Sequence, residues 1–312
     1  MTVQNAVAAR LIALDWGTSN LRATLLGEGG VVLDARAAAD GVMAVREGRF
    51  EDVLQALVGD WIAAHGCNLV ASGMIGSRQG WREAPYLDCP ATPAQAARSL
   101  VRVDLARGTR GVALHIVPGL RVLGADGEFD VMRGEETQIW GADLAPGQTC
   151  ILPGTHAKWV QVGEGGRIES FLTFMTGELY AVLTQHSILG RLMQFGSSSP
   201  ADFERGVRLG LAEYRKATHI LFAVRTAGLT DRVPPQGLPD YLSGLLLGIE
   251  IGSVLSTARG AMGAVTLLGD AALVARYVTA LGLAGIDAQA APADATTRGQ
   301  WRIAAAAGLT DR

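Results

Sequence analysis

The chain has no excess of positive charge. Its 27 Lys and Arg residues are set against 30 Asp and Glu residues, which gives a net charge of −3. Proteins that bind nucleic acids or anionic membranes usually carry a strongly basic face. The charge balance therefore argues against both kinds of partner.

Cysteine and long apolar runs are also scarce. Cys67, Cys89 and Cys150 lie far apart with no Cys-x-x-Cys pair, which indicates neither a disulfide framework nor a thiolate metal site. Residues 1–9 lack a basic segment followed by an apolar core, and no apolar run reaches the roughly 18 residues of a membrane span. We therefore expect a cytoplasmic protein that is neither exported nor membrane-bound.

Proline is sparse as well, whereas glycine is abundant. The 312 residues include 11 Pro and 40 Gly, and 49% are hydrophobic, against a usual glycine share of about 7%. A glycine excess without proline in an apolar chain favours tight strand connections and close approaches of backbone to groups such as phosphate. The length suits two domains of roughly 100–200 residues each.

A strand, Gly-Thr turn, strand, Gly-Glu-Gly-Gly turn and strand occur in that order twice. Gly17 and Gly154 mark the first turn of each copy, 137 residues apart, and Gly27 and Gly163 mark the second, 136 apart. Chance similarity of two glycine turns is the alternative, but the flanking strand order matches too. We predict two related lobes, residues 1–144 and 145–312.

Both Gly-Thr turns have the composition of an anion site. Gly17, Thr18 and Ser19 follow Asp15, and small residues in a turn can point N–H and hydroxyl groups at phosphate. A carboxylate beside them could hold Mg²⁺, which binds one or two carboxylates plus phosphate oxygens. In the second copy, Gly154 and Thr155 form the turn and Lys158 adds a cation. An ordinary hairpin is the alternative reading.

Several ordered blocks resemble a known family. DWGTSNLR (15–22), PGTHAKW (153–159) and LLGDAAL (267–273) resemble the phosphate 1, phosphate 2 and adenosine elements of the actin/hexokinase/Hsp70-like ATPase superfamily. With SGMIGSRQGW, APYL, MRGEETQ, TGELYAVLTQHS and SGLLLGIE, the order is similar to the 2-dehydro-3-deoxygalactonokinase family over nearly the whole chain.

This resemblance implies a fold and an activity. The fold is a two-lobed α/β, ribonuclease H-like (actin-like ATPase) fold with duplicated mixed β-sheet lobes and an interlobe cleft. The activity is ATP-dependent phosphorylation of 2-dehydro-3-deoxy-D-galactonate at its terminal (6-) hydroxyl in galactonate catabolism. ATP phosphates would lie between the two turns, including His156, with adenine against Gly269 and Asp270, where Asp270 is a helix N-cap candidate.

The catalytic base is an open point. Many sugar kinases of this superfamily carry an aspartate near the second hairpin, but Leu152 stands opposite Asp15. Glu135 and Glu136 resemble the G-E-E helix start of exopolyphosphatase-like relatives, where a glutamate is catalytic, and either could deprotonate a hydroxyl. The alternative is an acidic pair that complements the helix dipole. His156 is a further candidate.

The sugar acid needs a cation for its carboxylate. The loop from Ser72 to Trp81 follows a strand, at the edge where ligands of α/β sheets bind. Arg78 could pair with the carboxylate and Trp81 could cover the apolar sugar face, with Arg22 as a second cation; a surface loop with a solvated arginine is the alternative. Two rival functions are an exopolyphosphatase-like phosphohydrolase and an actin-like ATP switch. A homodimer is a candidate oligomeric state.

Overall fold

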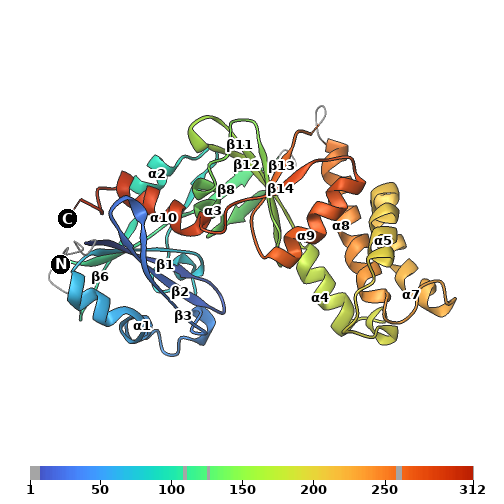
Figure 1. Ribbon diagram of the computed structural model, residues 1–312, viewed down its shortest axis with the longest axis horizontal. Coiled ribbons are helices and arrows are strands. Elements are labelled where there is room, and N and C mark those ends of the chain that lie inside the picture. The colour runs from blue at the N-terminus through green and yellow to red at the C-terminus, as the bar shows by residue number, and fades with distance from the viewer. Residues whose placement is uncertain (1–7, 108–110, 125–126, 258–261, 312) are drawn as a thin grey trace, which may run out of the picture. The chain divides into compact units, whose positions relative to one another are not determined.

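The computed structural model describes residues 8–107, 111–124, 127–257 and 262–311 (Figure 1). The predicted absence of a leader at residues 1–9 falls mostly outside these ranges. Two compact units divide the chain: unit 1 takes Met1–Gly147, Val162–Phe171 and Pro292–Arg312, and unit 2 takes Gln148–Gln161 and Leu172–Ala291. The lobe boundary between 144 and 145 stays a prediction, and each unit is described by itself.

Unit 1 is built on a mixed sheet in the order β3-β2-β1-β4-β7-β6. Its strands are β1 (Ala9–Trp16), β2 (Leu21–Gly27), β3 (Val32–Ala38), β4 (Asn68–Ser72), β6 (Val101–Asp104) and β7 (Ala113–Ile116). A second sheet orders β5 (Tyr86–Asp88), β8 (Gly119–Leu123) and β9 (Phe129–Met132). The helices are α1 (Phe50–His65), α2 (Pro93–Arg98), α3 (Glu135–Gly141) and α10 (Ala295–Ala306).

The core of unit 1 is the apolar face shared by its sheet and α1. Alternate residues of β1 and β4 are fully buried there together with Leu54, Val58 and Ile62 of α1. The C-terminal helix α10, red in Figure 1, lies beside α3 and β1 although it is about 280 residues from β1 in sequence. Gly141 and Gly299 allow this contact, because a Cβ on Gly141 would stand 1.8 Å from the carbonyl oxygen of Ala295.

Unit 2 carries a sheet in the order β12-β11-β10-β13-β14 and a layer of helices. The strands are β10 (Thr149–Leu152), β11 (Ala157–Val162), β12 (Ile168–Phe174), β13 (Val265–Leu267) and β14 (Ala288–Ala290). The helices are α4 (Thr176–His186), α5 (Pro200–Glu213), α6 (Ala217–Ile220), α7 (Phe222–Leu229), α8 (Leu238–Thr257) and α9 (Ala271–Leu283).

The glycines of α8 pack against another helix. Glycines four residues apart leave one face of a helix without side chains, so the sequence allows either another backbone or a nucleotide to pack there. A Cβ on Gly244 would lie 2.0 Å from the carbonyl oxygen of Phe203, and one on Gly248 would lie 2.3 Å from that of Val207. Both partners belong to α5, so close helix packing accounts for these two glycines.

Helix α8 is also long and apolar enough to cross a membrane, with 20 residues and a mean hydropathy of 1.3. Within unit 2, 78% of that apolar window is buried. A core helix covered on most sides by α5, α4 and α9 has this composition.

The duplication predicted from sequence is visible in the strands. β3-β2-β1-β4-β7 and β12-β11-β10-β13-β14 share one order, in which β1 and β10 each have an antiparallel neighbour on one side and a parallel neighbour on the other. The two Gly-Glu-Gly-Gly turns form matching 3-10 turns, with φ of 68° at Gly29 and 64° at Gly165.

One part of the predicted layout is wrong. The polar sequence of residues 289–298 predicts a loop, and residues 301–308 predict a closing helix, whereas β14 covers Ala288–Ala290 and α10 begins at Ala295. β14 extends the parallel part of the sheet by pairing with β13, a long-range contact that the polar sequence does not signal.

Candidate functional site

The first hairpin turn is held by backbone hydrogen bonds. Gly17 N–H donates to the carbonyl oxygen of Asn20 at 2.9 Å, and Val42 N–H donates to the carbonyl oxygen of Gly17 at 3.0 Å. Thr18 and Ser19 are exposed. A Cβ on Gly41 would lie 2.3 Å from the carbonyl oxygen of Thr18, so Gly41 seats the segment behind the turn. The turn thus has a rigid back and a polar, open front.

Asp15 stands at the end of β1, two residues before this turn. Its carboxylate accepts a hydrogen bond from Arg22 at 3.2 Å, and 28% of its side chain is exposed. Burial raises the pKa of Asp15, while the charge of Arg22 and its hydrogen bond act in the opposite direction. The predicted second cation Arg22 is therefore the ion-pair partner of the predicted metal ligand.

The flank of Asp15 is formed by Gly73, which has a φ of 95°. A Cβ there would stand 2.9 Å from the carbonyl oxygen of Trp16 and 3.7 Å from Asp15 Oδ1. A Cβ on Gly134 would in turn stand 3.1 Å from the Cα of Gly73. The start of α3 and the end of β1 therefore both pack on Gly73, which brings two predicted site segments together within unit 1.

Ser72 ends β4 and pairs with Asp15 in the register of the parallel strands. It is fully buried, and its hydroxyl oxygen accepts a hydrogen bond from Gln300 at 2.9 Å. Gln300 also donates to the carbonyl oxygen of Leu14 at 2.6 Å. Sequence reasoning missed Gln300, whose position in a polar C-terminal segment gives no local signal. Contact of Ser72 with the sugar acid stays a prediction.

The two glutamates of α3 have different surroundings. Glu136 is fully buried and accepts hydrogen bonds from Gly134 N–H at 2.7 Å and from the Thr137 hydroxyl at 3.0 Å. Burial, and next the neighbouring Glu135 carboxylate, raise the pKa of Glu136 to about 8. Glu135 is only partly buried and accepts a hydrogen bond from Arg133 N–H at 2.9 Å.

Arg78 and Trp81, two of the predicted residues in the Ser72–Trp81 loop, have different environments. Arg78 has 86% of its side chain exposed and pairs with Glu83 at 3.2 Å. Trp81 packs into the core, with its ring centroid 6.1 Å from that of Phe50 in a stacked arrangement and 6.5 Å from that of Trp16. The Trp81 ring thus uses its contacts to anchor the loop, and its predicted contact with the sugar stays a prediction.

The second hairpin turn lies in unit 2, against the start of α4. A Cβ on Gly177 would stand 2.4 Å from the carbonyl oxygen of Gly154, and Glu178 N–H donates to the carbonyl oxygen of Thr155 at 3.0 Å. His156 Nε2 is hydrogen-bonded to the carboxylate of Glu178. Gly177 follows Gly41 by 136 residues, the offset of the sequence repeat, so both copies use a glycine to seat the segment behind the turn.

Lys158 is buried on β11. Its Nζ donates a hydrogen bond to the hydroxyl of Thr173 at 2.7 Å. The predicted cation of the second turn therefore lies within the sheet, and its catalytic role stays a prediction.

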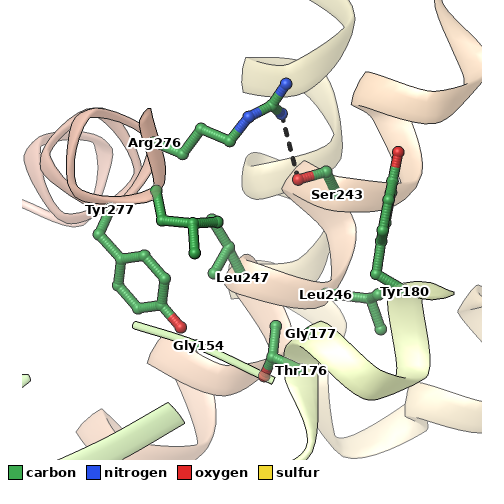
Figure 2. A pocket seen from close by; sticks show the side chains of 10 residues that line it. Gly154, Thr176, Gly177, Tyr180, Ser243, Leu246, Leu247, Arg276 and Tyr277 are labelled. Atoms are coloured by element: carbon green, nitrogen blue, oxygen red, sulfur yellow. Dashed lines mark hydrogen bonds between the residues drawn. The ribbon is translucent and has the colours of Figure 1, made fainter. Parts of the chain in front are cut away.

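A cavity of about 180 Å³ opens beside the second turn (Figure 2). Leucines supply most of its apolar wall, and Tyr180, Ser243 and Arg276 place polar groups around it. Arg276 donates a hydrogen bond to the Ser243 hydroxyl at 3.1 Å and pairs with Asp240 at 2.5 Å. The lining consists of Gly154, Thr176, Gly177, Tyr180, Ser243, Leu246, Leu247, Leu273, Arg276 and Tyr277.

One wall of this cavity is α9, the helix that follows Gly269 and Asp270. Asp270 caps it, accepting hydrogen bonds from Ala272 N–H at 2.9 Å and Leu273 N–H at 3.3 Å, which confirms the predicted N-cap. Gly269 has a φ of 154°, and a Cβ there would lie 3.3 Å from the carbonyl oxygen of Pro153. Their contact with nucleotide stays a prediction.

A buried carboxylate from α8 ties the elements of the cavity together. Glu250 is 1% exposed and accepts hydrogen bonds from Trp159 Nε1 at 2.7 Å and from the Tyr277 hydroxyl at 2.9 Å. The Thr176 hydroxyl is a third donor. Burial raises the pKa of Glu250 against the opposing effect of these bonds. The sequence signal was an isolated acidic residue in the apolar run that becomes α8.

A magnesium ion fits the chemistry of the first turn. Among the described residues no three His, Cys, Asp or Glu side chains gather as a metal group, but Mg²⁺ in phosphate sites needs only one or two carboxylates besides phosphate and water. Asp15 supplies a hard oxygen ligand, and its Oδ1 faces Gly73, where a side chain is missing. Asp15 is therefore the residue of unit 1 best suited to hold the ion.

The fold places the chain in a known class. A ligand-bound xylulose kinase from Lactobacillus acidophilus superposes with a TM-score of 0.52 at 9% identity, covering 97% of this chain and 90% of that one. A protein from Sinorhizobium meliloti with the assigned name 2-dehydro-3-deoxygalactonokinase superposes with a TM-score of 0.86 at 34% identity, covering 95% and 98%. The fold is the α/β fold shared by actin-like ATPases and sugar kinases.

Sequence comparison narrows this class. The family described as 2-keto-3-deoxy-galactonokinase matches residues 15–303. The 2-dehydro-3-deoxygalactonokinase of Escherichia coli (strain K12) is 37% identical over 92% of this chain and 94% of its own length. The probable 2-dehydro-3-deoxygalactonokinase of Rhizobium meliloti (strain 1021) is 36% identical over 95% and 96%. The chain belongs to the 2-keto-3-deoxy-galactonokinase family, which confirms the resemblance seen in the sequence.

Proposed function

We propose that this protein transfers the γ-phosphate of ATP to the terminal (6-) hydroxyl of 2-dehydro-3-deoxy-D-galactonate, a step of galactonate catabolism in the cytoplasm. Family membership and two relatives with this enzyme name support the proposal. They favour a kinase over the exopolyphosphatase-like and actin-like alternatives.

The observation that carries the proposal is Gly154. Its φ is not left-handed, and a Cβ there would meet no atom of the described residues within 4 Å. The fold therefore does not require glycine at this position, although it opens onto the cavity of Figure 2. A missing side chain that the fold does not need is explained by a ligand that approaches the backbone closely. Gly17 is similar, with its nearest neighbour 3.7 Å from a Cβ.

ATP fits the cavity beside Gly154. Leu246, Leu247 and Leu273 offer an apolar wall for adenine, and Tyr180 and Arg276 offer polar groups at its rim. From there the phosphates would extend toward Gly154 and Thr155, where His156, held by Glu178, lies at the turn. Unit 2 thus supplies the donor half of the reaction.

Unit 1 supplies the acceptor half. Asp15 would hold Mg²⁺ near Gly17, Thr18 and Ser19; the ion, when bound, neutralises charge on the transferring phosphate. The base is Glu135, because Glu136 is fully buried and its raised pKa keeps it neutral at pH 7. A partly exposed carboxylate at a helix start can accept the proton of the substrate hydroxyl.

The test is ADP release by the purified protein with Mg²⁺-ATP, with and without 2-dehydro-3-deoxy-D-galactonate. We expect release that depends strongly on the sugar acid, with phosphorus NMR placing the new ester at the terminal carbon. Release that is independent of the acid would favour an ATP switch, and phosphate release from polyphosphate would favour the phosphohydrolase.

The assignment of the base is tested by paired variants. Glu135→Gln should lower kcat by about 10²- to 10⁴-fold, the usual contribution of a general base. Glu136→Gln should retain most of the activity, because glutamine resembles the neutral form. The opposite ranking would reassign the base to Glu136.

A further inference from the structure

Arg133 is a cation set deep in unit 1, between the end of β9 and the start of α3. Its Nη2 donates a hydrogen bond to the carbonyl oxygen of Ala84 at 2.8 Å, and its Cζ lies 4.4 Å from the ring centroid of Tyr86. Its Nη1 lies 2.9 Å from the place where a Cβ on Gly76 would stand. The guanidinium is therefore packed between Tyr86 and the Ser72–Trp81 loop.

Two donors of this guanidinium are buried without an acceptor. Among the described residues, Arg133 Nε and Nη1 find no hydrogen-bond partner, and neither does the buried hydroxyl of Ser77, next to Gly76. A buried donor that is left unpaired costs about 1–3 kcal/mol, and buried charges are normally paired with an opposite charge. No Asp or Glu among the described residues forms an ion pair with Arg133. The fold thus keeps an unsatisfied cation beside Gly76 and an unsatisfied hydroxyl on the next residue of the chain.

Arg78, the exposed arginine of the Ser72–Trp81 loop, differs from Arg133 because its charge has partners. Arg78 is paired with Glu83 and is 86% exposed, so water and a carboxylate already satisfy its charge. An anion gains more from Arg133, because hydrogen bonds to a desolvated guanidinium are stronger than those at the surface. We therefore expect Arg133, and not Arg78, to bind the carboxylate of the substrate.

We propose that Arg133 and Ser77 together bind the carboxylate of the sugar acid, an inference that rests on the proposed function. Nε and Nη1 belong to the planar fork that matches a carboxylate in a bidentate pair, and the Ser77 hydroxyl adds a donor. Because Gly76 packs on Nη1, the proposal requires the Ser72–Trp81 loop to move outward when the carboxylate binds. The site selects sugar acids over neutral sugars.

The position of Arg133 suits this role. Glu135, the proposed base, is two residues further along and accepts the hydrogen bond of Arg133 N–H at 2.9 Å. One segment therefore carries both a carboxylate receptor and a proton acceptor. A sugar acid has its carboxylate at one end and its terminal hydroxyl at the other. Arg133 would bind the carboxylate, and Glu135 would accept the proton of the hydroxyl.

The experiment compares two substrates on matched variants. The substrates are 2-dehydro-3-deoxy-D-galactonate and its analogue with a hydroxymethyl group in place of the carboxylate. The variants are Arg133→Met, Arg133→Lys, Ser77→Ala and Arg78→Ala. The control is Arg121→Met, which removes an arginine of β8 that pairs with Asp88 on the surface. Turnover and the shift of Tm on adding each compound are measured for all of them.

We expect Arg133→Met to raise KM for the acid about 10- to 100-fold, the usual cost of losing hydrogen bonds to a charged group, with a small effect on kcat. The analogue should be equally poor with wild type and Arg133→Met. Arg133→Lys should recover part of the preference for the acid, Ser77→Ala should lose a smaller part, and Arg121→Met should match wild type. If Arg133→Met folds poorly, the preference for the acid over its analogue is compared between wild type, Arg133→Lys and Ser77→Ala instead.

The outcomes separate this inference from the proposed function. Undiminished preference for the acid in Arg133→Met, or its loss in Arg78→Ala instead, overturns the Arg133 site while leaving the kinase intact. If wild type does not phosphorylate the acid but the acid raises its Tm, and Arg133→Met abolishes that shift, the site stands and the proposed function fails. If the acid neither reacts nor shifts the Tm of wild type, both fail.

Discussion

Gly177 packs directly on Gly154. A Cβ on Gly177 would stand 2.4 Å from the carbonyl oxygen of Gly154, whereas a Cβ on Gly154 would have no neighbour within 4 Å in the part of the chain that the structure describes. The two glycines therefore have different reasons to lack a side chain: Gly177 seats the turn on α4, and Gly154 leaves room in front of it.

Gly177→Ala should lower Tm and raise KM for ATP, because the new methyl group pushes the turn forward; overpacking of this kind costs about 1–3 kcal/mol. The matched control is Gly282→Ala in α9, where a Cβ meets nothing within 4 Å and where alanine favours the helix by up to about 1 kcal/mol. Thermal unfolding and ATP titrations measure both. Equal Tm values for the two variants would show that Gly177 has no packing role.

Gly154→Ala should leave Tm unchanged and raise KM for ATP by about tenfold or more, since a displacement of about 1 Å in a reacting group can cost about 10²-fold. ATP should also raise the Tm of this variant less than that of wild type. A lower Tm of Gly154→Ala in the absence of ATP would show that the fold itself needs glycine there. The argument that a phosphate lies close to the backbone of Gly154 would then fail.

Asp15→Asn should lower kcat by roughly 10²-fold or more, because loss of the metal ligand forfeits several kcal/mol of charge stabilisation. Tm should change little, since burial already raises the pKa of this carboxyl and asparagine preserves its shape. Asp88→Asn, which removes a surface carboxylate paired with Arg121, is the control. Titration of Mg²⁺ separates the metal role from ATP binding: the requirement should rise in Asp15→Asn alone.

Glu136→Gln should flatten the pH dependence of stability. The unfolded carboxyl ionises near 4.5 and the folded one near 8, so the unfolded chain releases its proton first as pH rises. The contribution of Glu136 is therefore fully present below about pH 4.5 and is lost, to a total of a few kcal/mol, by about pH 8.

Denaturant unfolding of wild type, Glu136→Gln and the exposed control Glu83→Gln between about pH 5 and about pH 8 checks this sign. Wild type and Glu83→Gln should lose stability more steeply with rising pH than Glu136→Gln. Parallel curves for all three proteins would mean that Glu136 is ionised in the fold.

Glu250→Gln should lower stability by about 1–3 kcal/mol, because its amide group turns a donor toward the donors of Trp159, Thr176 and Tyr277. KM for ATP should rise with it, since Thr176 and Tyr277 line the cavity proposed for the nucleotide. Glu204→Gln, on the exposed face of α5, is the control for removing a carboxylate. A stability equal to that of wild type would show that the network does not hold the cavity.

Local patterns predicted much of the architecture. The two hairpin turns, the strand-turn-helix at Gly269 and the cap at Asp270 all follow from short-range rules of turn chemistry and helix capping. The repeat offset near 136 further indicated that one lobe copies the other, and the strand orders agree. The polar segment that becomes β14 was missed because pairing with β13, not its composition, makes it a strand.

The sequence by itself determined the family, the duplicated turns and the residue types available for phosphate, metal and proton transfer, because these depend on order along the chain. Only the tertiary structure decided how each group is used. It buried Glu136 and left Glu135 partly exposed, and it paired Arg22 with Asp15. It also packed Trp81 against the core and left Nε and Nη1 of Arg133 without an acceptor among the described residues. Burial and pairing set the charge and availability of a side chain, and both arise from contacts between segments far apart in sequence.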